Sequence, residues 1–222
     1  MARMGIRSIV RKKFRVRTTD SNHANPVAPN TLGRKFTDAK APDQIWGTDI
    51  TYIHTDEGVL YLAGVMDLFS RRIVGWSMDD TMTTKLVENA LSNALSSRKP
   101  SLPLLHHSDR GVQYTGAGCR ELLASNGIQA SMSRTGDCYD NAVVESFRGK
   151  LKTEMVYHRS FKNRAEAKAA AFDYIEVFYN RQRLHASLGY QSPEQFEASR
   201  TGRSECVNGN WVRSVLYVVA TA

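Results

Sequence analysis

Apolar residues form three closely spaced runs in the first half of the chain. Residues 45–54, 59–68 and 72–78 are rich in β-branched and aromatic side chains, and only short polar stretches separate them. Such runs are typical of strands, and short connections favour pairing between neighbours in the sequence. The pattern therefore predicts three antiparallel strands joined by turns, with the first turn at residues 56–58.

The apolar spacing then becomes helical. Residues 83–97 carry apolar side chains at every third or fourth position, which is typical of an amphipathic helix. Further along the chain, the same reasoning predicts strands at 102–107 and 128–132 and helices at 116–126, 140–157 and 164–180. The order of three strands, helix, strand, helix, strand, helix indicates an α/β fold that combines a meander with helical crossovers.

The two ends of the chain lack such periodicity. Residues 1–20 are rich in Arg and Lys, and residues 21–44 contain Asn, Pro, Thr and Gly. A linker or extended arm fits residues 21–44, and a solvated tail is the alternative. The stretch after about residue 200 has no clear pattern.

The charge of the chain is unevenly distributed. Its 222 residues carry a formal net charge of +8, an excess that favours a polyanionic partner such as nucleic acid. Residues 1–45 hold 10 basic and 3 acidic residues, residues 46–145 hold 8 and 12, and residues 146–222 hold 12 and 7. The acidic centre is either a scatter of surface carboxylates or a cluster that holds divalent cations between DNA-binding surfaces.

Cysteine and hydropathy patterns exclude several classes of protein. Cys119, Cys138 and Cys206 form no C-x-x-C pair, so neither a zinc finger nor a disulfide framework is expected. No apolar run approaches the roughly 20 residues of a membrane helix, and residues 1–14 lack the apolar segment of a signal peptide. We therefore expect a cytoplasmic protein.

Three carboxylates stand out, each with an ordinary alternative. Asp49 lies inside an apolar strand, where a charge is costly unless it is paired, solvent-facing or coordinating an ion. Asp109 follows a predicted strand and precedes Arg110-Gly111, where an Asp can simply form a turn. Glu145 borders the apolar stripe of a predicted helix and can pair with Arg148 three positions on.

The spacing of these carboxylates is more specific than any one of them. Between Asp49 and Asp109 lie 59 residues, and between Asp109 and Glu145 lie 35. This set resembles the Asp-Asp-Glu residues of the retroviral-integrase-like transposases. Four stretches resemble the catalytic protein of bacterial insertion-sequence elements of the IS-three type, namely WGTDITYI from residue 46, HHSDRGVQYT from 106, SMSRTGDCYDNAVVESF from 131 and YNRQRLHASLGYQSPEQF from 179.

The resemblance implies an RNase H-like fold, a mixed five-stranded sheet flanked by helices with a C-terminal helical extension. It implies a basic arm at residues 1–35 left from a helix-turn-helix region, a catalytic core at 36–199 and an atypical tail at 200–222. Asp49, Asp109 and Glu145 would then hold two Mg²⁺ ions, for which Mn²⁺ can substitute, and catalyse cleavage of element ends and strand transfer.

The resemblance also implies DNA-contacting residues and partners. A basic residue seven positions after the Glu, here Lys152, contacts the element end in the family. Arg148 and the block with Arg181, Arg183 and His185 are further candidates, and a helix end stabilised by cations is the alternative for that block. Expected partners are DNA, further copies of the chain and an upstream-frame helix-turn-helix protein. A DNA-binding remnant without catalysis and an RNase H-like nuclease are the alternative functions.

Overall fold

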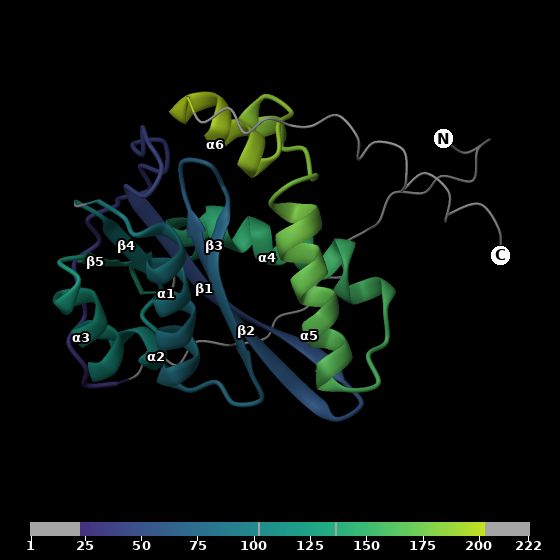
Figure 1. Cartoon of the computed structure of the whole chain (residues 1–222). Helices are drawn as coiled ribbons and strands as arrows, with labels where there is room; N and C mark the ends of the chain where they lie inside the picture. Colours follow the sequence, from purple (N-terminus) through teal and green to yellow (C-terminus); the bar gives the residue numbers. More distant parts are fainter. Residues whose placement is uncertain (1–22, 102, 136, 203–222) are drawn as a thin grey trace.

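A five-stranded sheet forms the centre of the molecule (Figure 1). The structure is a computed structural model that describes residues 23–101, 103–135 and 137–202. The strands are β1 (Ile45–Thr55), β2 (Gly58–Asp67), β3 (Ile73–Asp79), β4 (Leu105–Ser108) and β5 (Gln129–Met132).

The sheet has the order β3-β2-β1-β4-β5. The pairs β1–β2 and β2–β3 are antiparallel, whereas β4 runs parallel to β1 and β5 parallel to β4. The short turns allow the antiparallel pairs, and the parallel pairs need helical crossovers. The predicted mixed sheet with an antiparallel meander is thus confirmed.

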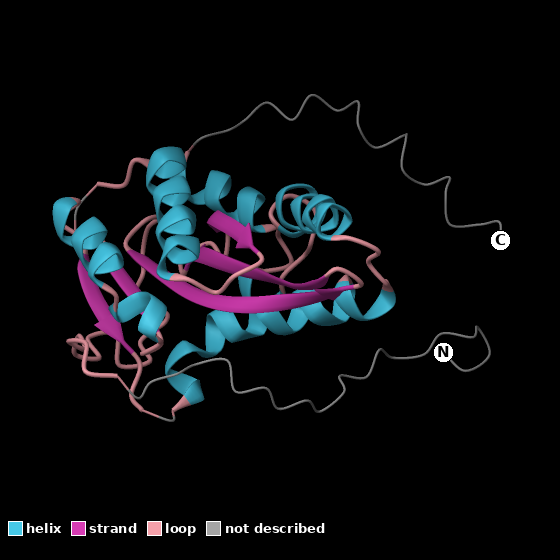
Figure 2. Cartoon of the chain, turned by 90° about the horizontal axis from the view of Figure 1, so that it is seen from below, coloured by secondary structure: helices cyan, strands magenta, loops and turns pink. Residues whose placement is uncertain are grey.

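Helices cover both faces of the sheet, as Figure 2 shows. On one face, α1 (Thr84–Arg98), α2 (Val112–Thr115) and α3 (Ala117–Ser125) bury a core that includes Trp46. On the other face, α4 (Ala142–Glu154) and α5 (Arg164–Phe172) pack on Ile45 and Ile53. Because neighbouring strand residues point to opposite faces, β1 contributes to both cores.

Two glycines allow helices to approach the sheet closely. A Cβ on Gly75 would lie 2.4 Å from the backbone nitrogen of Ala94 in α1. A Cβ on Gly47 would lie 2.6 Å from a methyl group of Val144 in α4. The second contact sets the height of α4 above β1, close to Asp49.

Several predicted boundaries were wrong. The strand expected at 102–107 begins at Leu105 in the described part of the chain, and Pro103 has no N–H for a ladder. The helix expected at 140–157 is α4 between the short 3₁₀ turns Cys138–Asn141 and Val156–His158.

The helix expected at 164–180 changes type along its length. It is α-helical in α5 and continues as a π-helix over Asp173–Tyr179. The wider π turn rotates the following side chains relative to α5. The expected apolar stripe is therefore only partly buried, with Ile175 and Tyr179 inside and Phe172 and Phe178 exposed.

Residues 23–44 have no regular elements but lie against the core. Leu32 is buried, and its backbone N–H donates to Ser131 Oγ on β5. His23 Nε2 contacts the carbonyl of Arg110, and Asn30 donates to Asp140. This part of the segment is an extended arm held by the sheet, so the solvated-tail alternative does not describe it. Residues 1–22 lie outside the described part of the chain.

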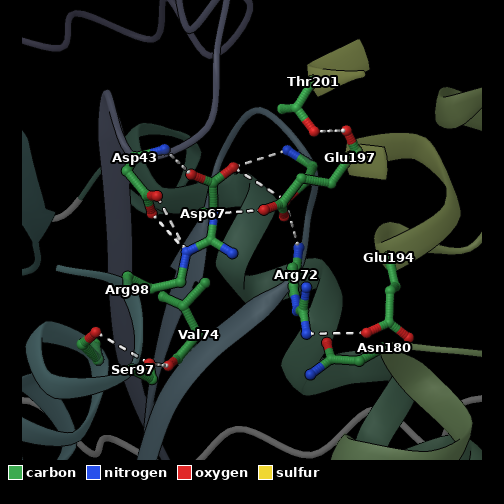
Figure 3. Close-up of polar contacts among 12 residues, drawn as sticks. Asp43, Asp67, Arg72, Val74, Ser97, Arg98, Asn180, Glu194, Glu197 and Thr201 are labelled. Carbon is green, nitrogen blue, oxygen red and sulfur yellow. Dashed lines mark hydrogen bonds and ion pairs between the residues drawn. The ribbon is translucent and has the colours of Figure 1, made fainter. Parts of the chain in front are cut away.

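The C-terminal extension ends in α6 (Pro193–Thr201), which a buried ion cluster fastens to the core (Figure 3). Arg98 of α1 pairs with Asp43 at 2.9 Å and with Glu197 of α6 at 2.5 Å. Asp67, buried at the end of β2, accepts the Asp43 N–H, and burial raises the pKa of Asp67 to about 6. One arginine thus joins α1, the arm and α6.

Candidate active site

Asp49 lies on the face of β1 that α4 covers. Its side chain is 12% exposed, so the solvent-facing alternative does not hold. Its Oδ1 accepts the backbone N–H of Ile50, while the buried Oδ2 accepts no hydrogen bond from the described residues. A buried carboxylate oxygen without a hydrogen bond is costly unless a cation faces it.

Asp109 follows β4 directly, beside β1. The parallel register pairs Gly47 with His107, and continuing this register by two residues brings Asp109 level with Asp49. Asp109 Oδ1 accepts the N–H of Gly111 at 2.9 Å, which forms the turn expected from the sequence. Asp109 thus forms a turn and also lies beside Asp49, because it directly follows the carboxyl end of β4, which runs parallel to β1.

Glu145 lies in the first turn of α4, and contacts with β1 hold that turn in place. Asn141 at the helix start donates its side-chain N–H to the carbonyl of Thr48 at 2.9 Å, next to Asp49. Val144 packs over Gly47. The two contacts bring Glu145 to the end of the sheet where Asp49 and Asp109 lie.

The Arg148 guanidinium lies between two of these carboxylates. Its Nη1 is 3.4 Å from Asp49 Oδ2, and its Nη2 is 3.8 Å from Glu145 Oε1. Burial raises the pKa of Asp49 to about 7; the Arg148 charge lowers it, and the charges of Asp109 and Glu145 raise it. The three carboxylates therefore interact electrostatically.

The donor set fits a hard divalent cation. Carboxylate oxygens are the ligands that Mg²⁺ prefers, and the buried Oδ2 of Asp49 lacks a hydrogen-bond donor among the described residues. Within residues 23–101, 103–135 and 137–202, however, no three His, Cys, Asp or Glu side chains form a ready group for a metal ion. In the described chain, Asp49 and Glu145 pair with Arg148 where a metal ion would lie. The carboxylates are therefore not already arranged around a metal position.

Lys152 packs on the same strand as Asp49. Its ammonium group lies 3.9 Å from the centre of the Tyr52 ring and donates to the Tyr52 carbonyl. Burial, and secondarily the Arg148 charge, lower the pKa of Lys152 to about 8. To contact DNA as predicted, the Lys152 ammonium group would have to move away from the Tyr52 ring and carbonyl.

The C-terminal candidates make contacts within the chain. Arg183 forms a bidentate pair with Glu154 at the end of α4, and Arg181 lies 3.5 Å from Glu194 of α6. His185 is buried beside Tyr179. These are side-chain contacts rather than cations placed at the end of a helix, so they confirm neither interpretation of Arg183 and His185, and their DNA contacts stay predictions.

One important carboxylate escaped the sequence reasoning. Asp140 is fully buried just before α4 and accepts hydrogen bonds from Arg134, Arg34 and Asn30. The side-chain hydrogen bonds from Arg134 contribute most to holding its pKa well below the usual range. The available signal was the dipeptide Asp140-Asn141 before a helix, which reads as an ordinary helix start.

The two histidines before Asp109 are also buried. His107 lies between Ser131 and Ser133, with its ring nitrogens 2.9 and 3.2 Å from their hydroxyls. Burial lowers the pKa of His106 to about 4 and also lowers that of His107. Both rings are therefore neutral at pH 7 and pack at the end of β4.

Comparison with known proteins shows the family of this chain. The integrase core domain family matches residues 39–138, and a second integrase core domain family matches 145–200. The transposase InsF for insertion sequence IS3A of Escherichia coli (strain K12) is 45% identical over 197 residues, which cover 89% of this chain and 68% of the relative. The chain belongs to the insertion-sequence transposases with an integrase core domain.

Two further transposase relatives agree. The transposase for insertion sequence element IS904 of Lactococcus lactis subsp. lactis (strain IL1403) is 43% identical, over 83% of this chain and 73% of the relative. The insertion element IS600 uncharacterized 31 kDa protein of Shigella sonnei is 50% identical, over 84% and 68%. The chain thus spans roughly seven-tenths of the length of these relatives.

Solved structures confirm the RNase H-like fold of the transposase. The HTLV-2 integrase catalytic core domain in complex with magnesium (trimeric form) superimposes with a TM-score of 0.55 at 19% identity, covering 71% of this chain and 98% of that chain. A chain in the simian T-cell lymphotropic virus intasome with PP2A regulatory subunit B56 gamma gives 0.60 at 17% identity, covering 82% and 61%.

These matches identify a DNA transposase catalytic domain of the polynucleotidyl transferase class. They do not favour the non-catalytic remnant or the RNase H-like nuclease. In the described part of the transposase, no helix is both long and apolar enough to span a membrane.

Proposed function

We propose that Asp49, Asp109 and Glu145 are the catalytic residues of this transposase and hold two Mg²⁺ ions, with Mn²⁺ as a substitute. The observation that carries the proposal is the buried Oδ2 of Asp49, which accepts no hydrogen bond and, among the described residues, pairs with the Arg148 guanidinium alone. The register beside Asp109 and the packing of α4 on Gly47 support the same group. The magnesium complex of the HTLV-2 integrase core agrees with it.

The proposed chemistry is two successive phosphoryl transfers. In the first, a water oxygen attacks a phosphodiester at the element end, and the bond from phosphorus to the 3′ oxygen breaks. In the second, the released 3′-hydroxyl attacks a target phosphodiester, and a target 3′ oxygen leaves. When bound, Mg²⁺ supplies the Lewis acid that lowers the pKa of the attacking hydroxyl and stabilises the leaving oxygen.

In this scheme, side chains of the protein bind the metal ions and orient the DNA. Asp49 would be the central ligand, because its side chain is 12% exposed against 35% for Glu145, and Asp109 and Glu145 would complete the set. Arg148 releases both carboxylates on metal binding and then lies beside the DNA backbone. We propose Lys152 as a phosphate contact, because it lies on the Arg148 side of α4, and Arg181 as a more peripheral one.

The proposal includes the organisation of the whole protein. Residues 36–199 are the catalytic core, residues 1–35 are a basic arm that adds non-specific DNA affinity, and residues 200–222 are an atypical tail. The transposase acts on element ends and target DNA as a homo-oligomer, together with an upstream-frame helix-turn-helix protein that recognises the ends. The dimeric and trimeric forms of the HTLV-2 integrase core agree with self-assembly.

The test is nicking of supercoiled plasmid and strand transfer of duplex oligonucleotides with Mg²⁺ or Mn²⁺. We expect Asp109→Asn and Glu145→Gln each to reduce both reactions at least about 100-fold, because each removes a metal ligand. Glu121→Gln, which removes an exposed carboxylate on α3, is the control. Full activity in Asp109→Asn would overturn the assignment, and selective cleavage of an RNA–DNA hybrid would favour the nuclease alternative.

A further inference from the structure

A cavity lies on the side of α4 that faces away from Glu145. It has a volume of about 250 Å³, and its wall includes Arg71, Lys150 and His185. Lys150 follows Glu145 by five positions, which places it about 140° further around the helix. The cavity is therefore separate from the group of three carboxylates, although both use α4.

The wall of this cavity is cationic. Arg71 and Lys150 both line it, and none of the described residues that line it is Asp or Glu. Within the described ranges, neither Arg71 nor Lys150 has a carboxylate within ion-pair distance. Glu154, which faces Lys150 electrostatically, is already held by Arg183 and by the Tyr174 hydroxyl. The two positive charges thus share a half-buried space without a neutralising carboxylate in its wall.

Two buried nitrogens in this wall have no hydrogen-bond partner among the described residues. They are Nη1 of Arg71 and Nε2 of His185. The His185 side chain is nearly inaccessible at 3% exposure, and its ring lies edge-on against Tyr179. An unsatisfied buried polar group destabilises the fold, so two around one cavity indicate that a missing acceptor belongs there.

The backbone holds both groups firmly at the cavity. Arg71 has a left-handed φ of 63° in the tight turn between β2 and β3, and its N–H donates to Asp67. His185 exchanges backbone hydrogen bonds with the loop that follows, donating to Gln191 and accepting from Leu188 and Tyr190. The backbone at both residues is therefore ordered before any ligand arrives, which reduces the entropy lost on binding.

The protonation states also suit an anion. Burial, then the charges of Lys150, Arg183 and Arg71, lower the pKa of His185 to about 4, so its ring is neutral at pH 7 and carries one N–H. Burial lowers the pKa of Lys150 as well. A bound anion offsets both effects, because it restores the favourable environment of the cations.

We propose that this cavity binds a phosphate group through Arg71, Lys150 and the ring N–H of His185. Ser146 and Ser187, both exposed at the cavity wall, allow the group to enter from the surface and add hydroxyl donors. A phosphate group brings negative charge to the two cations, two charges at most as inorganic phosphate and one as a phosphodiester, and its oxygens accept bonds from several directions. The source is either free inorganic phosphate or a DNA phosphodiester.

The first experiment measures inorganic phosphate binding to the full chain in EDTA, by calorimetry and by thermal unfolding against chloride at equal ionic strength. We expect Lys150→Gln to weaken phosphate binding at least about ten-fold, which equals about 1.4 kcal/mol. Arg71→Gln serves as the second variant, and Lys162→Gln, which removes an exposed charge elsewhere, is the control. Absent binding to the wild type, or equal binding by both cavity variants and the wild type, would overturn the proposal.

A second experiment identifies the source of the phosphate. If it belongs to DNA, Lys150→Gln lowers the slope of log affinity against log salt for a duplex by about 0.9, and free phosphate competes with the duplex. If it is a free anion, duplex affinity stays unchanged while phosphate binding is lost. The inference does not rest on the catalytic assignment, because both measurements are made without divalent metal, and Asp109→Asn should bind phosphate normally.

Discussion

Arg148 Nη1 lies 3.4 Å from Asp49 Oδ2, and the same guanidinium reaches to within 3.8 Å of Glu145. One turn of α4 separates Glu145 from Arg148, whereas Asp49 comes from β1. The arginine therefore supplies the positive charge that two of the three carboxylates need while no metal is bound. In the proposed function, a metal ion would have to replace Arg148 at both carboxylates, which would couple the position of Arg148 to metal binding.

Replacing Arg148 should increase metal affinity. In Arg148→Gln the carboxylates have no competing cation and the incoming metal meets one charge less of repulsion. We expect the dissociation constant for Mn²⁺ without DNA to fall about five-fold, equivalent to about 1 kcal/mol. Calorimetry or electron paramagnetic resonance measures it. As a control, Arg181→Gln removes one positive charge beside Glu194 and should bind Mn²⁺ like the wild type. A weaker Mn²⁺ affinity in Arg148→Gln would contradict the idea that Arg148 and the metal compete for the same carboxylates.

Neutralising Asp49 should stabilise the metal-free fold while it abolishes catalysis. Burial raises the pKa of Asp49 to about 7, so its contribution to stability is full below the unfolded pKa near 3.8 and is lost as pH rises through about 7. Asp49→Asn removes this loss. Its unfolding free energy in EDTA should therefore rise relative to the wild type between about pH 4 and pH 7 and stay level above. Chemical denaturation at several pH values measures it, and a difference independent of pH would refute the buried charge.

Asp140→Asn should have the opposite pH dependence. The pKa of Asp140 is depressed, so its contribution is present above the unfolded pKa and is lost as pH falls below it. At pH 7 we expect the variant to lose about 2–3 kcal/mol of unfolding free energy, because two arginines lose their buried acceptor. The loss should shrink below about pH 4. Asp137→Asn, at a more exposed carboxylate in the same cluster, should lose less at pH 7.

Lys152 gives a pH-dependent test of DNA contact. Its pKa is lowered to about 8, so the side chain is charged at pH 7 and largely neutral above pH 9. Lys152→Gln should weaken duplex binding at pH 7 and lower the salt slope by about 0.9, and both differences should vanish above pH 9. The control is Lys85→Gln, at an exposed lysine of α1. Unchanged DNA binding at pH 7 would leave Lys152 as a support for Tyr52 alone.

The sequence by itself determined the order of the elements and singled out three candidate carboxylates, Asp49, Asp109 and Glu145. The apolar runs of β1, β2 and β3 and the periodicity of α1 are local patterns, and the 35-residue spacing between Asp109 and Glu145 is independent of geometry. The ends of elements were harder to predict from the sequence. Examples are the start of β4, which lies after Pro103, and the point where α5 becomes a π-helix.

Only the tertiary structure decided which side chains meet. Both faces of β1 are buried, so alternation could not place Asp49 until α4 was packed on Gly47. Arg148 lies near Asp49 because the contact of Asn141 with Thr48 sets the position of α4. His185, expected at the DNA, is buried beside Arg71 and Lys150 because the chain folds back after Tyr179. Apart from that of His185 with Lys150, these pairs join residues 93 to 114 positions apart, and hydrophobic periodicity carries no information about pairing at that range.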